Sequence, residues 1–195
     1  MRFLSQATVP YATALRARLA DGYAWHGAIW ESFPGRPDAE RDFLFRVDRR
    51  TGGFRLLLLS TVKPTATETL VWRTKEVASS FLDHAAYRFR VKANPTMRRS
   101  ADKRRLALTD EARLREWLIR KAAAGGFEIN AASLEVGAPL DETFVKGGRR
   151  GKHVGVDFAG VLRVIERARF VQTFHSGIGT AKGFGFGLLM LQPIH

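Results

Sequence analysis

The chain has 195 residues, 45% of them hydrophobic, so it can bury a core and is too apolar to be disordered over most of its length. It has no cysteine and no apolar run near the ~18 residues that cross a bilayer, which excludes disulfides, a thiolate metal site and a membrane-spanning helix. Its 32 Lys and Arg against 19 Asp and Glu give a formal net charge of +13, and such an excess attracts polyanions.

Composition therefore favours a nucleic acid as the partner. No long basic amphipathic helix stands out, so an anionic membrane is the weakest alternative, and an acidic protein is another. A soluble basic protein without such a partner would show the same charge. The first residues, MRFLSQATVPYA, lack the apolar core of a signal peptide, and the absence of cysteine suits a reducing compartment. We expect a cytoplasmic protein.

The first half of the chain predicts a helical stretch between strands. Apolar and aromatic residues recur at three- and four-residue steps from Leu15 to Trp30, which is typical of a helix, although Asp21-Gly22 can divide or kink it. In chain order we expect a strand over 2–9, helix over 11–32, strands over 43–47 and 54–60 joined by a hairpin turn, and a short strand around residue 71 with a poorly defined helix within 65–82.

The second half repeats this order with clearer signals. Residues 87–93 (YRFRVKA) alternate apolar with basic side chains, which predicts a strand with one positive, solvated face. Thr109, followed by two acidic residues, is expected to cap a helix over 109–123 that Gly125-Gly126 end. The remaining expected elements are a basic loop up to residue 105, a Gly- and Arg-rich loop after residue 145, a strand over 153–164, a helix over 165–175, a glycine-rich turn, and a buried strand over 186–191.

The order strand, helix, two strands, helix, strand thus occurs twice. This βαββαβ order is that of ferredoxin-like folds, including the RRM type, and two such units fit the length of the chain. We predict an α+β chain of two tandem ferredoxin-like domains. The N-terminal domain covers 1–84 and carries the helix of His26, and the C-terminal domain covers 85–195 and carries the basic and glycine-rich loops.

His26 is the first candidate for chemistry. Tyr23 lies three residues before it and Trp30 four after, so the three side chains project from roughly one side of a helix. An imidazole exchanges protons near neutrality, and a phenol beside it can complete a proton-transfer pair. The structural alternative is a hydrogen-bonded histidine on a partly buried aromatic face.

The sequence holds no recognisable metal or cofactor site. The spacings HxH, HxxxH and HExxH are absent, and the carboxylates of RPDAERD alternate with arginine. The GxSxG and GxxxxGK[ST] patterns are absent as well. A nuclease built from these residues is therefore expected to work without metal and without a small-molecule cofactor.

The segment 177–187 (GIGTAKGFGFG) is the most specific local pattern. Glycines let backbone N–H groups approach a phosphate, and the lysine adds charge. A dinucleotide fingerprint would lie between a strand and the helix that follows it, whereas here the helix comes first. A long turn is the structural alternative, and we expect it to need fewer than five glycines. The predicted RNA contacts of this segment are Gly177, Gly179, Lys182, Gly183 and Gly185.

Two basic clusters flank strands of the second half and can act as arms along an RNA duplex. Charge runs are often merely solvated, and the net charge of +13 argues against that reading here. The predicted RNA contacts are Arg98, Arg99, Lys103, Arg104 and Arg105 in one cluster, and Lys146, Arg149, Arg150 and Lys152 in the other.

Four segments, in order and spanning essentially the whole chain, resemble the CasE type of CRISPR repeat-processing endoribonuclease, a subunit of the Cascade complex. They are YAWHGAIWESF (23–33), RPDAERDFLF (36–45), RFRVKANP (88–95) and GIGTAKGFGFGLL (177–189). The last resembles the glycine-rich loop of the wider repeat-associated RNA-binding superfamily. The resemblance implies two tandem ferredoxin-like domains that bind the stem-loop of a CRISPR repeat. It also implies metal-free cleavage at the 3′ base of the stem, a 2′,3′-cyclic phosphate, retention of the product, and other Cascade subunits as partners.

Residue by residue, the resemblance places the family's catalytic histidine on His26, its assisting tyrosine on Tyr23 and its loop lysine on Lys182. Thr180 stands where the family often has proline, which changes the stiffness of the loop. Residues 149–152 lie where members carry a variable basic hairpin that enters the groove of the stem, a correspondence of location rather than motif.

Two other functions remain open at this point. The chain can be a non-catalytic RNA-hairpin-binding subunit of the same fold, in which His26 is structural. It can also be a basic assembly protein that meets RNA only through protein neighbours. The sequence leaves open whether His26 acts as base or acid and what Tyr23 does.

Overall fold

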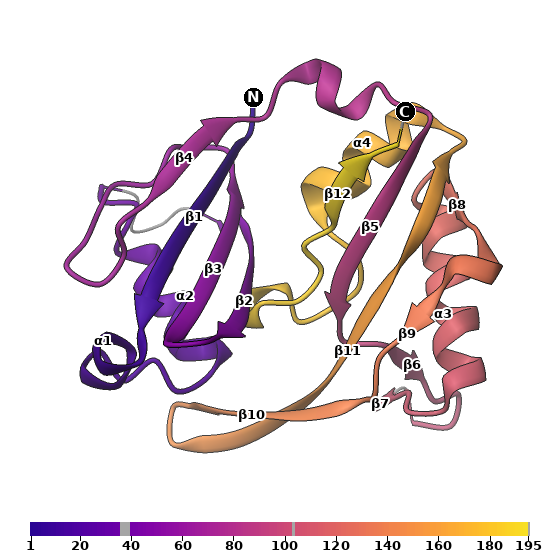
Figure 1. Ribbon diagram of the computed structural model, residues 1–195. Helices are drawn as coiled ribbons and strands as arrows, with labels where there is room; N and C mark the ends of the chain where they lie inside the picture. The colour runs from indigo at the N-terminus through magenta and orange to yellow at the C-terminus, as the bar shows by residue number, and fades with distance from the viewer. Residues whose placement is uncertain (36–39, 103, 195) are drawn as a thin grey trace. The chain divides into compact units, whose positions relative to one another are not determined.

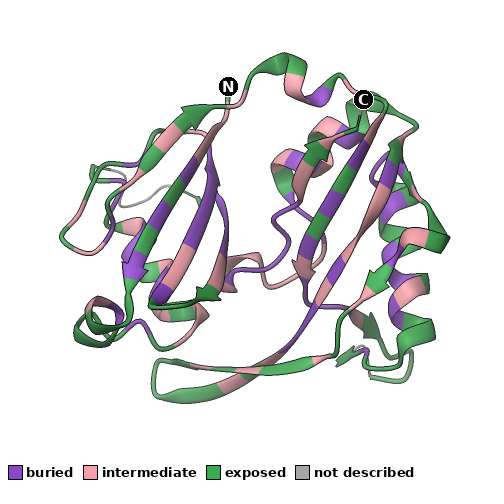
Figure 2. Cartoon of the chain, in the orientation of Figure 1, coloured by how far each residue is buried: buried purple, intermediate pink, exposed green. Residues whose placement is uncertain are grey.

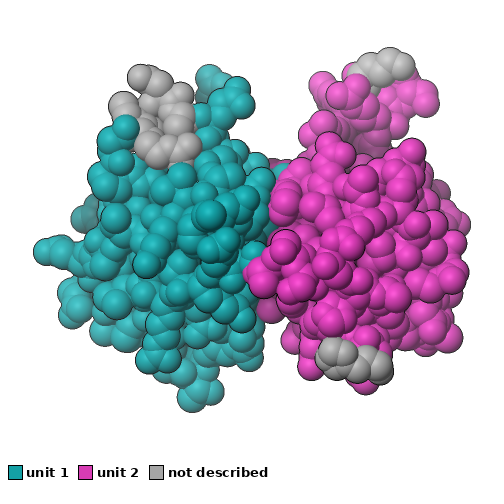
Figure 3. All heavy atoms as spheres, turned by 90° about the horizontal axis from the view of Figure 1, so that it is seen from above, with its two compact units in different colours: residues 1–77, 143–151, 182–185 teal, residues 78–142, 152–181, 186–195 magenta. Residues whose placement is uncertain are grey.

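The computed structural model describes residues 1–35, 40–102 and 104–194, so the predicted RNA contact Lys103 lies outside the described residues. The chain forms two compact units, coloured separately in Figure 3. Unit 1 comprises residues 1–77, 143–151 and 182–185, and unit 2 comprises residues 78–142, 152–181 and 186–195. Unit 1 therefore includes two short segments from late in the sequence.

Unit 1 is built on an antiparallel sheet with the strand order β2-β3-β1-β4 (Figure 1). Trp25 and Ile29 of α2 pack with Val9, Leu56 and Leu58 of β1 and β3 into one apolar core. The elements are β1 (Phe3–Pro10), α1 (Tyr11–Arg16), α2 (Gly22–Trp30), β2 (Leu44–Arg50), β3 (Gly53–Ser60) and β4 (Arg73–Glu76).

The helical stretch predicted over 11–32 is two helices, because α1 ends at Arg16 and Asp21 caps the start of α2. The strand expected around Val71 begins later, at Arg73. The poorly defined helix after it is the short 3-10 helix η1 (Ser79–Leu82), which belongs to unit 2.

Unit 2 is built on a second sheet, in which β10, β11, β5 and β12 are neighbours in that order and β8 and β9 also pair with β11. The alternation predicted for β5 is confirmed: Tyr87 and Phe89 are buried, whereas Arg88 and Arg90 are exposed (Figure 2). The elements are β5 (Ala86–Ala93), β6 (Thr96–Arg98), β7 (Arg105–Ala107), α3 (Glu111–Ala124), β8 (Phe127–Ile129), η2 (Ala131–Ser133), β9 (Glu135–Val136), β10 (Leu140–Lys146), β11 (Arg149–Val164), α4 (Arg167–Ser176) and β12 (Met190–Pro193). The tip of the β10–β11 hairpin (143–151) and the 3-10 helix η3 (Lys182–Phe184) belong to unit 1.

Helix α3 buries Leu114, Trp117 and Leu118, as its period predicts. Its N-cap is Asp110 rather than Thr109, because the helix begins one residue later than expected and the Asp110 carboxylate accepts the backbone N–H of Arg113 at 3.0 Å. Within the described ranges, no helix is both long and apolar enough to cross a membrane.

Two segments predicted as basic loops are hairpins. Strands β6 and β7 pair across the first, and Gly147 and Gly148 turn the second with φ of 54° and 74°, the left-handed values that a two-residue hairpin turn favours. The predicted last strand is also displaced. Phe186 to Leu189 are buried without strand pairing and β12 starts at Met190, because Gly185 and Gly187 have positive φ and keep this stretch out of an extended ladder.

Candidate functional site

The carboxylate of Asp21 joins the start of α2 to the tip of the β10–β11 hairpin, all within unit 1. Its Oδ1 accepts the backbone N–H groups of Tyr23 and Ala24, both at 2.9 Å, which is a helix N-cap. Its Oδ2 accepts the backbone N–H of Val145 at 3.0 Å. One side chain therefore starts the helix of His26 and holds the hairpin tip against it.

The segment η3 packs against the same end of α2. A Cβ on Gly22 would lie 2.5 Å from the carbonyl oxygen of Phe184, so this close approach requires glycine. The ring of Phe184 lies 6.3 Å from that of Tyr23 and 4.4 Å from that of Phe144, measured between centroids. The helix, the hairpin tip and η3 thus meet around Tyr23, although they are far apart in sequence.

His26 is half-buried among aromatic rings, with centroids of Phe43 at 5.5 Å and Phe45 at 6.4 Å. The indole Nε1–H of Trp30 donates to Nε2 of His26 at 3.2 Å. A nitrogen that accepts a hydrogen bond carries the lone pair, so the proton of the neutral ring is on Nδ1. The predicted alignment of His26 with Trp30 on one helix face is confirmed.

Burial lowers the pKa of His26 below its ordinary value of 6.5, and the nearby positive charges of Arg41 and Lys146 lower it further. At neutral pH the imidazole is therefore uncharged and can accept a proton. This electrostatic setting suits a general base at the start of a reaction better than a general acid.

Tyr23 is 39% exposed, and the Nζ of Lys146 lies 5.7 Å from the centre of its ring. Among the described residues, the structure forms no hydrogen bond between the Tyr23 phenol and the His26 imidazole. The two side chains instead share neighbours. The charge of Lys146 lowers the pKa of His26 and its ammonium lies over the ring of Tyr23, and η3 packs against the helix that carries both residues.

The glycine-rich segment is divided between the units. Lys182, Gly183 and Gly185 belong to unit 1 with His26, whereas Gly177 and Gly179 belong to unit 2. Gly177, Gly179 and Gly185 have φ of 76°, 82° and 90°, so the path of the backbone itself favours glycine there. Gly187 has a positive φ as well and Gly183 does not, so the turn accounts for four of the five glycines, and the glycine count alone does not indicate phosphate binding.

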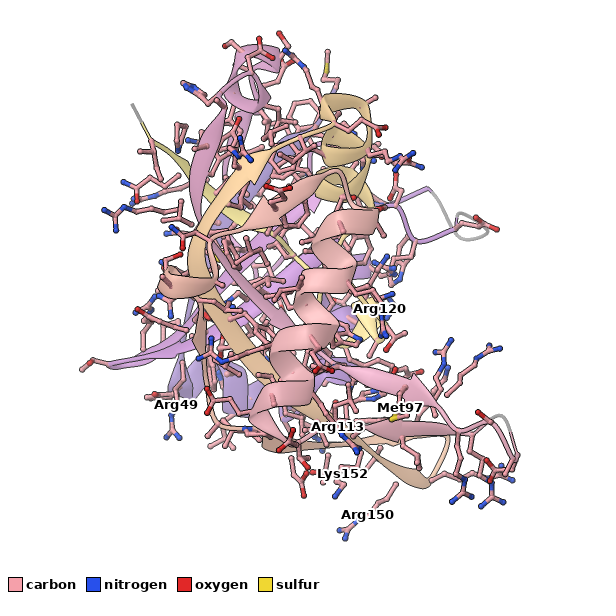
Figure 4. The ribbon with its side chains drawn as sticks, turned by 90° about the vertical axis from the view of Figure 1, so that its right-hand side faces the viewer. Arg49, Met97, Arg113, Arg120, Arg150 and Lys152 are labelled. Atoms are coloured by element: carbon pink, nitrogen blue, oxygen red, sulfur yellow. The ribbon has the colours of Figure 1, made fainter. Side chains whose placement is uncertain are left out.

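The predicted basic contacts are all exposed where the structure describes them, apart from Lys182, which is half-buried on η3. On the β10–β11 hairpin, Lys152 forms an ion pair with Asp141 at 2.9 Å, and Arg150 and Lys152 project from the ribbon in Figure 4. On the β6–β7 hairpin, Asp102 pairs with Arg99 and lies 3.4 Å from the Nε of Arg104. The structure describes Arg98, Arg105, Lys146 and Arg149 as exposed as well.

Sequence reasoning missed two members of this site. Asp21 is a helix-capping residue type in front of a helical period, and that signal could have identified the cap but not the contact with Val145. Arg41 lies inside the quoted segment RPDAERDFLF, where nothing local indicates that it is half-buried near His26. In the part of the chain that the structure describes, no group of three or more His, Asp or Glu side chains is arranged to hold a metal ion.

Over residues 3–193 the chain matches the family model described as CRISPR associated protein. It is 35% identical to the CRISPR system Cascade subunit CasE of Escherichia coli K12, over 92% of this chain and 96% of that protein. It is 34% identical to the CRISPR-associated endoribonuclease Cse3 of Thermus thermophilus, over 54% of this chain and 55% of that protein. The solved structure of Thermus thermophilus Cse3 bound to an RNA representing a pre-cleavage complex is similar with a TM-score of 0.84 at 25% identity, over 98% of this chain and 99% of that one.

These similarities confirm the predicted α+β fold of two tandem ferredoxin-like domains. They also confirm the resemblance found from the four sequence segments, because the family model spans nearly the whole chain. The chain belongs to the family of CRISPR-associated proteins.

Proposed function

We propose that the chain is a metal-independent endoribonuclease that binds the stem-loop of a CRISPR repeat and cleaves it at the 3′ base of the stem. The protein retains the product, which ends in a 2′,3′-cyclic phosphate, as a subunit of Cascade. The observation that carries this proposal is His26, an uncharged imidazole with its acceptor nitrogen near Gly183, in the unit that holds the basic hairpin tip. The names of two relatives, a Cascade subunit and an endoribonuclease, support it independently.

The reaction is a transesterification within the RNA. The 2′-hydroxyl beside the cleaved linkage gives its proton to Nε2 of His26, the 2′-oxygen bonds to phosphorus, and the bond from phosphorus to the 5′-oxygen breaks. We assign the proton that the 5′-oxygen takes up to the phenol of Tyr23, with the ammonium of Lys146 stabilising the phenolate. Exchange with water then restores both side chains. The products are a 2′,3′-cyclic phosphate and a 5′-hydroxyl.

The indole of Trp30 prepares His26 for this step. The indole N–H fixes the His26 tautomer that has its lone pair on Nε2. The hydrogen bond between the two nitrogens is 3.2 Å long, which is at the long end of the range for N–H donors. The ribose hydroxyl therefore replaces a weak hydrogen bond when the RNA binds. Holding the 2′-oxygen in line with the leaving oxygen supplies a further part of the rate.

The exposed cations on the two hairpins are proposed to hold the RNA through its phosphates. The tip of the β10–β11 hairpin belongs to the same unit as the proposed chemistry and contacts α2 through Asp21 and Tyr23. The full set of proposed RNA contacts is Arg98, Arg99, Lys103, Arg104, Arg105, Lys146, Arg149, Arg150, Lys152, Gly177, Gly179, Lys182, Gly183 and Gly185.

One observation favours the alternative of a non-catalytic RNA-binding subunit. Trp30 already donates to Nε2 of His26, and Phe43 and Phe45 pack around the ring, as they would around a structural histidine. The two functions differ in one outcome. A structural His26 is needed for folding and binding, whereas a catalytic His26 is needed for the chemical step alone.

The test incubates the purified protein with the hairpin of its CRISPR repeat in excess chelator. We expect cleavage at the 3′ base of the stem that His26→Ala abolishes while hairpin affinity is retained. A 2′-deoxy substitution at the cleaved nucleotide should also prevent cleavage, because the nucleophile is missing. Tight binding without cleavage by the native chain would establish the non-catalytic subunit instead, and no binding by the native chain at low salt would leave only an assembly protein.

A further inference from the structure

Arg41 is a half-buried arginine in the segment that leads into β2 of unit 1. One of its amino groups donates to the backbone carbonyl of Phe43, and its guanidinium carbon lies 6.0 Å from the centre of the Phe43 ring. Burial lowers the pKa of Arg41, although the charge of Asp42 opposes this. A guanidinium remains charged in proteins even so, and a half-buried charge is unfavourable unless something compensates for it.

The guanidinium of Arg41 and the imidazole of His26 face the same point. A Cβ placed on Gly183 would lie 3.9 Å from Nε2 of His26 and 4.0 Å from Nε of Arg41. That point has no side-chain atom of its own only because residue 183 is glycine. A hydrogen-bond acceptor and a cation thus lie on two sides of one small open space beside η3.

We propose that this space is a phosphate site, in which Arg41 binds a non-bridging oxygen of the linkage that is cleaved. The inference rests on the proposed function, since His26 must then reach the 2′-hydroxyl of the same linkage. A guanidinium carries five N–H donors in a rigid fork, so it can hold the Phe43 carbonyl and a phosphate oxygen together. Negative charge grows on the phosphate oxygens as the 2′-oxygen attacks, and a fixed cation stabilises that charge most strongly in the transition state.

The alternative is that Arg41 only anchors the chain before β2. The charges around His26 argue against this. The segments packed against it carry Arg41 before β2, Lys146 on β10 and Lys182 on η3, with Asp42 beside Arg41. Cations beside a general base keep it uncharged at neutral pH, but they repel the positive charge that it gains with the proton. An anion in the site offsets that repulsion during the reaction.

The first test replaces the charge. Arg41→Gln should slow cleavage at saturating protein by roughly 100- to 1000-fold, the usual effect of removing a transition-state donor. Hairpin affinity should change far less, because the other cations remain. The cleavage rate of Arg41→Lys should lie between those of the native chain and Arg41→Gln, since lysine keeps the positive charge but lacks the forked donors of a guanidinium. Arg49→Gln is the matched control. Arg49, labelled in Figure 4, is an exposed arginine of unit 1, and its guanidinium donates to the hydroxyl of Tyr11. Its loss should leave the rate unchanged.

The second test fills the space without changing charge. The Cβ distances at Gly183 are ordinary van der Waals contacts, so Gly183→Ala should fold as the native chain does and lose cleavage, because its methyl group occupies the phosphate position. Gly27→Ala is the control on the same helix as His26. A Cβ there meets nothing within 4 Å, and both stability and rate should be retained. Native cleavage by Gly183→Ala would show that the space is not used.

The third test separates this inference from the proposed function, because it needs no cleavage. A 2′-deoxy hairpin is prepared with either a phosphate or an uncharged methylphosphonate at the 3′ base of the stem. The methylphosphonate should weaken binding to the native chain and to Arg49→Gln, but have little further effect on Arg41→Gln. Additive losses would overturn the role of Arg41 even if His26 cleaves. Coupled losses, together with no cleavage of the all-ribose hairpin by the native chain, would sustain the phosphate site and refute the enzyme.

Discussion

The β6–β7 hairpin and the tip of the β10–β11 hairpin are both basic, but they differ in what their charges and backbones contact. On β6–β7, Asp102 lies between Arg99 and Arg104 and partly neutralises them. The tip residues 144–151 (FVKGGRRG) contain no acidic residue. The first hairpin belongs to unit 2, and the tip of the second belongs to unit 1 with His26.

The second difference concerns the attachment of the tip. Val145 donates its backbone N–H to Asp21, and the Lys146 ammonium lies over the ring of Tyr23. An RNA strand held by this tip is therefore held in a fixed relation to α2. The difference in charge alone would not connect either hairpin to α2, whereas the backbone contact connects the β10–β11 tip to it. The β10–β11 tip is suited to align RNA for chemistry, whereas the β6–β7 hairpin is suited to hold it.

For the difference between the two hairpins, the largest expected effect comes from removing one carboxylate at each of them, Asp21 at the β10–β11 tip and Asp102 in β6–β7. Asp21→Ala should lower the free energy of unfolding by about 1–2 kcal/mol through the lost N-cap. It should also slow cleavage by roughly 10- to 100-fold, because a displacement of about 1 Å at a site costs that much. Asp102→Ala should leave the rate unchanged and bind RNA at least as tightly, because it releases two arginines.

Urea denaturation and single-turnover cleavage measure the two parts of this prediction separately. Asp21→Asn serves as a second variant, since an amide oxygen can still cap the helix. Equal rates for Asp21→Ala and Asp102→Ala would mean that the tip is not coupled to the chemistry.

A smaller effect is expected on the salt dependence of binding. Replacing Arg149 and Arg150 with alanine should lower the slope of log affinity against log salt by roughly 1.5, because each phosphate contact contributes about 0.7 to 0.9. Replacing Arg99 and Arg104 should lower it by less, because Asp102 already neutralises part of their charge. The slopes come from hairpin titrations at several salt concentrations, and equal decreases would remove this distinction between the hairpins.

Local patterns predicted the parts of the fold that depend on local physics. The alternation of Tyr87 to Ala93 determined which face of β5 is buried, since successive strand side chains point to opposite faces. The four-residue step from His26 to Trp30 predicted neighbours on a helix, and the structure joins them by a hydrogen bond. Both relations lie within a single element.

The contacts that assemble the candidate site could not be predicted in this way. Asp21 and Val145 are 124 positions apart, and Gly22 approaches Phe184 from the opposite end of the chain. Such contacts follow from how distant segments pack, and no spacing in the sequence encodes them. The cap of α3 shows the same limit. Threonine and aspartate side chains both accept backbone N–H groups, so the sequence allowed Thr109 as well as Asp110, and where the helix begins decides between them.

The smallest expected effect is a displacement of the pH profile. If the uncharged form of His26 is the base, kcat/KM should fall as the pH drops through the pKa of the free protein, at a midpoint below 6.5. Lys146→Met removes a positive charge that lowers the pKa of His26, so the midpoint should move upward. Lys152→Met removes the same charge from the same hairpin, but Lys152 pairs with Asp141 and should leave the midpoint in place. A rate that instead falls with rising pH would make His26 the acid. An equal shift of the midpoint in both lysine variants would mean that the hairpin tip acts on His26 only through its net charge.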